Sequence, residues 1–345
     1  MSKVKWGVIG CGGIADRRTL PGMMDAENAE LIAVMDSNPD AAKRVCEKYG
    51  AKYAFSTVEE LLAIDEIEAV YIASPVFCHK EQCKKAAKAK KHILLEKPMG
   101  LTIAESEEIA ACCDAEGVKL GVAFMMRFHS YHQKMKEIIA QGTIGEIVSA
   151  RAQFTCWYPE IENCWRQNKA LSGGGAMLDM GIHAIDLIRY ITDLDVAEVS
   201  GFAGNQIFKY NVDDASVGVY KMTNGALCVV EAAFNIPDDV SVSKLEFYGT
   251  KGCIIAKGTL SQVEDGDVEV LAINDAGEYD AQQNRSTVTP IKLDVTFGNM
   301  YTKEIKAFGN AVLGIGEIPI TAADAIASQK AIEDLYNKEY VSWKN

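Results

Sequence analysis

Short apolar runs alternate with helical patterns through the first 123 residues of the chain. The apolar runs predict buried strands at residues 4–9, 30–35, 69–73, 92–96 and 120–123. The intervening segments predict helices at residues 14–24, 39–49, 58–64, 80–89 and 103–116. Strand and helix joined by such short connections form right-handed βαβ units. The sequence therefore predicts an α/β fold with a doubly wound parallel sheet, buried on both faces.

After residue 124 the pattern changes to that of an α+β fold. Strand patterns at 146–156, 215–222, 226–234, 245–248 and 253–256 dominate, with helical patterns at 131–141, 176–191, 300–313 and 322–338. Asn224-Gly225 between two strand runs is typical of a type I′ hairpin. We expect a domain at residues 1–123 and a second at 124–345, with a large, mostly antiparallel open sheet. The terminal helix could pack back on the first domain.

The composition excludes several classes of function. The 345 residues hold 48 Asp and Glu against 35 Lys and Arg, a formal net charge of −13. Without a dense basic stretch, such a chain repels phosphate backbones and anionic lipid, so we expect neither nucleic acid nor membrane as a partner. No apolar run approaches the roughly 20 residues of a membrane span. We expect a cytoplasmic protein whose ten cysteines are reduced and mostly buried.

A glycine-rich turn follows the first strand. Gly10-Cys11-Gly12-Gly13-Ile14-Ala15 is a G-x-G-x-x-A pattern that opens a helix. Gly10 permits the tight turn, Gly12 lets the backbone approach a pyrophosphate, and the amides of Gly13 and Ile14 are placed to bind it. Asp36, after the second strand, can accept hydrogen bonds from the adenosine ribose. A glycine turn with a helix-capping Asp36 is the alternative, but the agreement of these signals favours a Rossmann dinucleotide site.

The same acid bears on which dinucleotide is bound. The carboxylate of Asp36 would repel a 2′-phosphate, and Ser37-Asn38 supplies no arginine to receive one. Arg44, in the next helix, could modify this preference. NAD is therefore the expected cofactor and NADP the less favoured one.

Two further segments carry candidate catalytic groups. Lys97 in Glu96-Lys97-Pro98 follows the strand at 92–96, at the carboxyl edge where parallel sheets bind ligands. Its amine can hydrogen-bond a substrate hydroxyl, and a positive nicotinamide nearby would lower its pKa. Pro98 suggests a rigid turn, for which a cis bond is one option. A solvated surface lysine is the alternative.

The second segment runs from Gly173 into a helix. Asp179 and His183 are spaced i, i+4 and share one face of that helix. A carboxylate one turn away orients a histidine and makes it more basic, as a general base requires. A buried histidine satisfied by a local aspartate is the alternative interpretation.

Taken together, the nucleotide turn, Glu96-Lys97-Pro98 and the Asp179/His183 helix resemble the Gfo/Idh/MocA oxidoreductase family over nearly the whole chain. Ile72-Ala73-Ser74-Pro75 with His79 is similar to another family motif, although Val76 stands where Asn is common. Residues 122–128 resemble its interdomain crossover, and 245–252 a late hairpin. Trp165-Arg166 matches a pair that often contacts the nicotinamide end.

The resemblance implies roles for individual residues. Lys97, Asp179 and His183 would be catalytic, and Ser74, Pro75, His79, Glu96, Lys97, Trp165 and Arg166 would contact the cofactor. A secondary hydroxyl of a sugar, a polyol or a derivative would lose a hydride to nicotinamide and its proton to His183, oriented by Asp179, while Lys97 shares the developing charge. The alternative within the family is that Lys97 is the main proton acceptor. Two alternatives stay open: a redox-neutral NAD-dependent glycosidase on the same scaffold, and a non-catalytic nucleotide-sensing regulator.

The remaining candidates are weaker. Arg127, Tyr158 and Arg166 could bind substrate hydroxyls, and Trp157 or Trp165 could stack on a sugar, but interdomain packing and surface salt bridges explain them equally well. His129 and His132, near a helix start, are expected to be solvated. His79 and Cys83 have metal-compatible spacing without a third ligand, so we expect no metal site. Loops at 158–171 and 263–290 should set specificity, and the broad sheet should support a homodimer or homotetramer.

Overall fold

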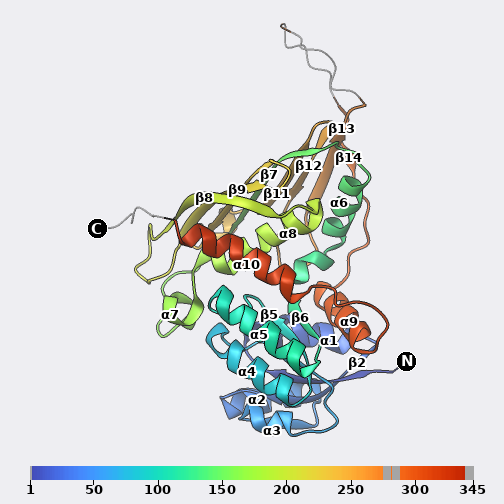
Figure 1. Ribbon diagram of the computed structural model, residues 1–345, viewed down its shortest axis with the longest axis vertical. Coiled ribbons are helices and arrows are strands. Elements are labelled where there is room, and N and C mark those ends of the chain that lie inside the picture. Colours follow the sequence, from blue (N-terminus) through green and yellow to red (C-terminus); the bar gives the residue numbers. More distant parts are fainter. Residues whose placement is uncertain (1, 275–280, 282–287, 339–345) are drawn as a thin grey trace. The chain divides into compact units, whose positions relative to one another are not determined.

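The computed structural model describes residues 2–274, 281 and 288–338. The chain forms two compact units, each built from more than one segment. The first comprises Met1–Phe128, Asn163–Gly173 and Asn299–Lys330, and the second His129–Glu162, Gly174–Gly298 and Ala331–Asn345. Figure 1 labels the elements along the chain. No helix in the described part of the chain has the length and apolar character needed to cross a membrane.

A six-stranded parallel sheet forms the centre of the first unit, in the order β3-β2-β1-β4-β5-β6. Its strands are β1 (Val4–Ile9), β2 (Ala29–Met35), β3 (Tyr53–Phe55), β4 (Ala69–Ile72), β5 (His92–Glu96) and β6 (Leu120–Ala123). The helices between them are α1 (Leu20–Asp25), α2 (Pro39–Tyr49), α3 (Val58–Leu62), α4 (Val76–Lys88) and α5 (Ile103–Glu116). A π-helical stretch, Ala15–Thr19, precedes α1. The predicted parallel sheet is confirmed, although the short strand β3 was not expected.

Local signals explain several helix starts. Asn38 caps α2, its side chain accepting a hydrogen bond from the Asp40 amide at 3.1 Å, and Pro39 occupies the first helical position. Thr57 and Glu60 form the reciprocal capping box at the start of α3. These short-range hydrogen bonds set where each helix begins. Because the loops between strand and helix are short, they also determine which residues lie at the ends of the preceding strands.

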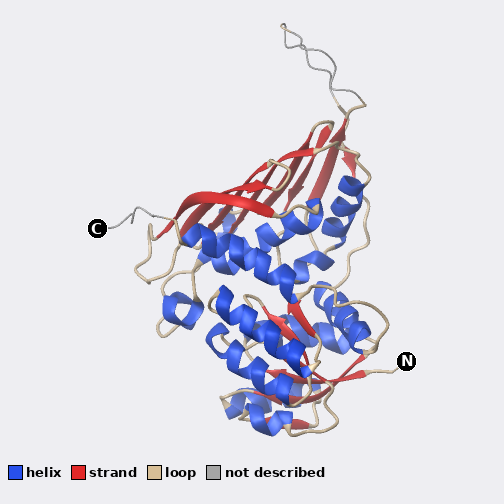
Figure 2. Cartoon of the chain, viewed as in Figure 1, coloured by secondary structure: helices blue, strands red, loops and turns tan. Residues whose placement is uncertain are grey.

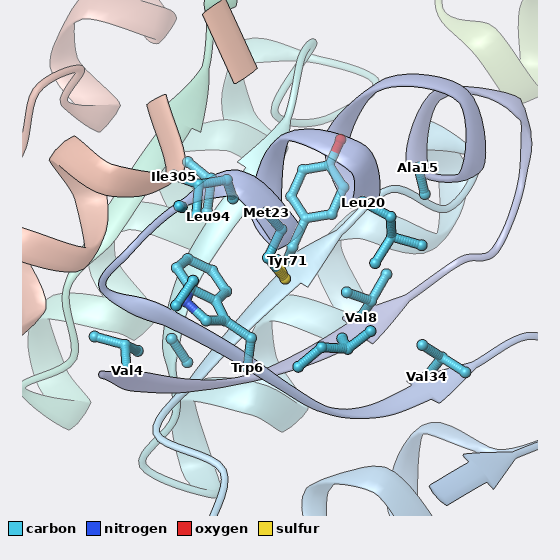
Figure 3. Close-up of a cluster of buried hydrophobic side chains, with 14 of the residues drawn as sticks. Val4, Trp6, Val8, Ala15, Leu20, Met23, Val34, Tyr71, Leu94 and Ile305 are labelled. Carbon is cyan, nitrogen blue, oxygen red and sulfur yellow. The ribbon is translucent and has the colours of Figure 1, made fainter. Parts of the chain in front are cut away.

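The core of the first unit combines residues from both ends of the chain. Trp6 and Tyr71 from the sheet are fully buried together with Met23 of α1 (Figure 3). Helix α9 (Met300–Val312) adds Ile305 and Phe308 to this core. The centres of the Phe308 and Trp6 rings lie 5.7 Å apart. The first unit is therefore completed by a helix encoded near the end of the sequence.

The second unit is built on an eight-stranded sheet in the order β14-β13-β12-β11-β7-β10-β9-β8. The strands are β7 (Ile147–Thr155), β8 (Val196–Gly204), β9 (Ala215–Met222), β10 (Leu227–Ala233), β11 (Lys244–Gly249), β12 (Gly252–Lys257), β13 (Asp267–Ala272) and β14 (Ile291–Lys292). Only β7 and β10 pair in parallel among these described strands. This confirms the predicted α+β part with a mostly antiparallel sheet.

Helices cover one face of that sheet (Figure 2). They are α6 (Ser130–Ala140) and α8 (Ile182–Thr192), the latter preceded by a π-helical stretch, Met177–Gly181. Along β9 the residues alternate between buried and exposed, as expected for a sheet with one covered face. The sheet thus supports α8 on one side and leaves its other face accessible within this unit.

Three expectations for the second half were wrong in detail. The turn at Asn224-Gly225 is not type I′, because only Gly225 has a positive φ, of 89°, and the Gly225 amide bonds the Met222 carbonyl. The segment 263–290 was expected to lack strands, yet it contains β13. Residues 275–280 and 282–287 of that segment lie outside the described residues. Strand β8, with few buried positions, was also missed.

Candidate active site

The glycine turn has the geometry that a dinucleotide requires. Gly10 has a φ of 96°, and a Cβ there would come within 2.8 Å of the carbonyl carbon of Ala73 and the amide nitrogen of Ser74. This turn and the loop after β4 thus meet at the point where the strand order reverses between β1 and β4. A Cβ on exposed Gly12 would meet no atom within 4 Å. The space beside Gly12 therefore fits an approaching pyrophosphate.

Asp36 is joined to this turn by a hydrogen bond. Its Oδ2 accepts from the Cys11 amide at 2.8 Å and its Oδ1 from the Asn38 amide at 2.9 Å. The half-buried carboxylate is thus fixed between the glycine turn and the start of α2. A carboxylate held at this position can accept further bonds from ribose hydroxyls, because each oxygen has a second lone pair.

The loops after β4 and β5 are joined by His79. This side chain is buried, with Nδ1 3.0 Å from the Pro98 carbonyl oxygen and Nε2 3.0 Å from that of Ser74. Burial lowers the pKa of His79 despite these two carbonyls. The Lys97–Pro98 bond is cis, the option raised from the sequence. His79 therefore holds in place the loops that carry Ser74 and Lys97.

Glu96 belongs to a buried polar network that the sequence did not reveal. Its Oε1 accepts from the Tyr71 hydroxyl at 2.5 Å, and that hydroxyl accepts from Thr19 Oγ1 at 2.9 Å. Burial raises the pKa of Glu96, while the bond from Tyr71 and the charges of Lys97 and Arg166 act to lower it. Burial and the charge of Glu96 also raise the pKa of Glu304 well above its usual range. Glu96 and Glu304 come from segments far apart in the sequence, so no local motif predicts that they lie close together.

Trp165 and Arg166 lie in the first unit, although the sequence places them after residue 124. They form a single 3₁₀ turn, with the guanidinium carbon of Arg166 4.4 Å from the centre of the Trp165 ring. The Trp165 ring also contacts that of Phe77 edge-on, at 6.5 Å between centres. Since the charge of Arg166 acts on Glu96, this turn lies near the end of β5, as a nicotinamide contact would require.

Asp179 and His183 lie on the helix that contains the π-helical stretch, in the second unit. Asp179 is half-buried and His183 is 5% exposed. Cys156 at the end of β7 is close to this site: burial, together with the charges of Asp179 and Asp238, raises the pKa of its thiol to about 12. A π-helical turn at this position is typical of functional sites, because it breaks the regular helix geometry.

An aspartate that the sequence analysis missed fixes the start of this helix. Asp213 accepts hydrogen bonds from the Gly175 amide at 2.7 Å and the Met177 amide at 2.9 Å. It also accepts from Ser216 Oγ at 2.7 Å and from the Tyr336 hydroxyl at 2.6 Å. A Cβ on Gly175 would overlap the Asp213 carbonyl oxygen, so glycine is required there. The adjacent acids Asp213-Asp214 just before a strand were the available signal.

The other predicted substrate contacts have structural partners. Arg127 is buried and pairs with Asp324, with 3.5 Å between guanidinium nitrogen and carboxylate oxygen. Tyr158 packs on Phe234, with 5.0 Å between ring centres. Exposed Trp157 contacts Phe208 edge-on at 5.3 Å. The ion pair of Arg127 with Asp324 lies within the first unit and favours a structural role for this arginine.

The expectation that His129 and His132 are solvated was wrong. Both are fully buried, with their rings 4.6 Å apart. His129 caps α6 by accepting a hydrogen bond at Nδ1 from the Tyr131 amide, at 3.1 Å, and its Nε2 lies 3.1 Å from the Asp265 carbonyl oxygen. Backbone groups and aromatic neighbours thus satisfy a polar ring inside the protein, which the sequence pattern around a helix start does not show.

The structure brings the predicted residues together in two groups. The first unit holds the glycine turn, Asp36, Lys97 and Arg166, whereas the second holds Asp179, His183 and Tyr158. Within the described residues, no three His, Cys, Asp or Glu side chains gather in a way that could hold a metal ion. The chemistry available is therefore nucleotide binding in one unit and acid–base groups in both.

Two family models match the chain. Residues 4–124 match an oxidoreductase family with an NAD-binding Rossmann fold, and residues 132–255 match the GFO/IDH/MocA C-terminal domain. Together these matches cover most of both units.

Individual relatives extend over nearly the whole chain. It is 28% identical to 1,5-anhydro-D-fructose reductase of Ensifer adhaerens, over 94% of this chain and 92% of that protein. It is 27% identical to D-xylose 1-dehydrogenase (NADP(+)) 2 of Haloferax volcanii, over 96% of each. The crystal structure of aldose-aldose oxidoreductase from Caulobacter crescentus with glycerol matches with a TM-score of 0.86. That match has 22% identity over 97% of this chain and 96% of that one, and it shows the shared fold.

Proposed function

Because the chain belongs to the GFO/IDH/MocA oxidoreductase family, we propose that it is an NAD-dependent oxidoreductase acting on a secondary hydroxyl or ketone of a sugar, polyol or derivative. The NAD(P)-binding Rossmann part and relatives named for sugar chemistry support the class of reaction. In this proposal residues 1–123 form most of the nucleotide site, to which Trp165 and Arg166 of the same unit contribute, and the second unit supplies Asp179 and His183.

The observation that carries the proposal is the glycine turn. Gly12 leaves open space beside the start of a helix, and Asp36 is fixed at the other end of the turn by the Cys11 amide. Backbone amides at a helix start bind phosphate, and a fixed carboxylate binds ribose hydroxyls. This pair of features fits a dinucleotide and has no use in a simple sugar-binding site. When bound, nicotinamide accepts a hydride from the substrate carbon or returns one to a ketone.

The proposed roles of the side chains follow from their chemistry. In the oxidising direction the substrate carbon loses a hydride and its hydroxyl loses a proton. His183 accepts that proton, and Asp179, one turn away on the same helix, keeps the imidazole oriented and basic. Lys97 hydrogen-bonds the same oxygen and shares its developing charge. His79 holds the loop of Lys97 in place through the Pro98 carbonyl.

The test combines a substrate panel with a variant. Sugars, polyols and glycosides are incubated with the enzyme and NAD, and both NADH formation and glycoside cleavage are measured. We expect NADH formation with at least one sugar or polyol. His183→Ala should then lower kcat at least about 100-fold, as loss of a general base does, while its NAD dissociation constant stays unchanged. Asp179→Asn should also lower kcat, whereas Asp193→Asn at the exposed far end of the same helix should not.

Each contrary result has a definite meaning. Unchanged turnover in His183→Ala would remove His183 from the mechanism. Glycoside cleavage without net NADH would replace the dehydrogenase with the redox-neutral glycosidase. Tight NAD binding with no reaction across the panel would instead indicate a nucleotide-sensing regulator.

A further inference from the structure

Beside the glycine turn, one aspartate binds two basic side chains. Asp16 lies in the π-helical stretch after the turn, where its amide bonds the Gly12 carbonyl at 2.9 Å. Its Oδ2 is 2.5 Å from the Arg44 guanidinium and its Oδ1 is 2.8 Å from the Lys48 amine. Arg44 and Lys48 are spaced i, i+4 on α2 and so share one face of that helix. Both carboxylate oxygens are therefore engaged with cations of the neighbouring helix.

These cations lie near the position expected for the adenosine ribose. Helix α2 starts three residues after Asp36, the predicted ribose ligand. Burial and the charge of Asp36 raise the pKa of the Cys11 thiol to about 12, whereas the charge of Arg44 lowers it. Arg44 and Asp36 therefore both act on the same residue of the glycine turn. A 2′-phosphate on that ribose needs a cationic partner. Ser37 and Asn38 carry no positive charge, so Arg44 and Lys48 are the candidates for that partner.

The exposures show which group is fixed and which are available. The side chain of Asp16 is 14% exposed, whereas those of Arg44 and Lys48 are 55% and 51% exposed. The two cations bring the pKa of Asp16 below its usual range although partial burial acts to raise it, so the carboxylate is ionised. Together with Asp36, the cluster carries no net charge. A dianionic 2′-phosphate would have to compete with Asp16 for the cations and would also face Asp36.

We propose that Asp16 is a specificity-determining residue: by binding Arg44 and Lys48 it prevents them from receiving a 2′-phosphate, so that the chain selects NAD over NADP. This inference rests on the proposed function only in assuming that the glycine turn binds a dinucleotide. Two acids then determine the cofactor preference. Asp36 repels the 2′-phosphate directly, and Asp16 occupies the two cations that could otherwise bind it.

The test measures dissociation constants for NAD and NADP by isothermal titration calorimetry, without any substrate. Asp16→Asn keeps the side-chain size and removes the charge. It should lower the dissociation constant for NADP about tenfold, which corresponds to the contribution of one charge-assisted hydrogen bond to phosphate. The dissociation constant for NAD should change by less than about twofold. Adding Arg44→Gln and Lys48→Gln to Asp16→Asn should reverse the gain, and high salt should reduce it.

A matched control separates specific from general charge effects. Glu66 in the same unit also binds two lysines, Lys5 at 3.2 Å and Lys52 at 3.0 Å, and Glu66→Gln changes the net charge equally. It should leave both dissociation constants unchanged. Thermal unfolding checks that each variant is folded, and Asp16→Ser serves as a second replacement if the Asn variant does not fold.

Three outcomes would overturn the inference: equal tightening of NAD and NADP, an equal effect of Glu66→Gln, or a gain that persists when both Arg44 and Lys48 are replaced. Failure of the assumed dinucleotide site looks different, because the unmodified protein would then bind neither nucleotide. Failure of the proposed reaction alone would appear in the substrate panel and leave these dissociation constants unaffected.

Discussion

At the scale of single residues, two positions of the glycine turn are glycine for different physical reasons. Gly10 is required by the fold, since its φ is 96° and a side chain would collide with the backbone at Ala73 and Ser74. Gly12 is not, because a methyl group there would point into open space. The motif thus combines a glycine that the fold requires with one that, in the proposed function, gives the pyrophosphate access to the backbone.

Alanine substitutions should separate these two purposes. Gly10→Ala should lower the free energy of unfolding by about 1–3 kcal/mol, the usual cost of a strained backbone position. Gly12→Ala should leave stability within about 0.5 kcal/mol of the unmodified protein and weaken NAD binding at least about tenfold. Urea unfolding and calorimetric titration measure the two effects. If Gly12→Ala binds NAD normally, the open space beside Gly12 is not where the pyrophosphate lies.

At the scale of elements, the helix carrying Asp179 and His183 depends on a residue far along the chain. Four donors converge on the Asp213 carboxylate, two of them amides at the helix start. Burial and the charge of Asp213 raise the pKa of Tyr336 well above its usual range, so its hydroxyl remains a donor. Helix α8, strand β9 and the end of α10 (Ala322–Tyr336) are therefore joined through one side chain.

Asp213→Asn should destabilise this junction. An amide has only one accepting oxygen and presents its own N–H groups to donors, so we expect a loss of about 2–4 kcal/mol in the free energy of unfolding. Asp193→Asn, at the exposed other end of α8, should cost less than about 0.5 kcal/mol. Urea denaturation checks both values. Equal stability of the two variants would mean that the Asp213 bonds contribute nothing net.

At the scale of the whole molecule, the uncovered face of the eight-stranded sheet is apolar in part. Phe202 on β8, Val217 and Val219 on β9, and Leu227 on β10 are each at least 41% exposed. Phe202 and Val217 lie opposite each other across the β8–β9 pair. Contiguous exposed apolar side chains on a sheet indicate an interaction surface. We therefore expect this face to mediate the self-association proposed from the sequence.

Phe202→Glu should weaken that association at least about 100-fold, because a charge would be buried without a partner in the interface. Sedimentation velocity over a range of concentrations measures the effect. Met24→Glu is the matched control, since Met24 in the first unit is 52% exposed against 51% for Phe202. Retained assembly in the Phe202 variant would assign the interface to another surface.

The sequence was sufficient for the elements whose signals are local. Strands β1, β5 and β6 and helices α2 and α5 have the predicted bounds, because continuous apolar runs and capping residues mark them. The strands it missed lack that signal. Strand β3 has three residues, none of them buried, and β8 has one buried position among nine. Strand β3 pairs with β2 and β8 with β9 through backbone hydrogen bonds, which leave no apolar pattern in the sequence.

The same limit applies to the candidate site. Motifs identified the glycine turn, Lys97 and the Asp179/His183 helix, each within a few consecutive residues. The acids that shape them, Glu304 against Glu96 and Asp213 against Gly175, come from segments far along the chain. His129 and His132 show the converse, since polar residues were assumed to be solvated and are buried instead.

The contact between Trp6 and Phe308 has a consequence for biosynthesis. The ribosome releases β1 long before α9, which begins at Met300. Until then Trp6 of the nascent chain lacks the part of its apolar cover that Phe308 provides. A message truncated after the second sheet would therefore encode every strand of the nucleotide-binding sheet and still not complete that unit. The unit that contains β1 is therefore completed only after the chain has been made as far as α9.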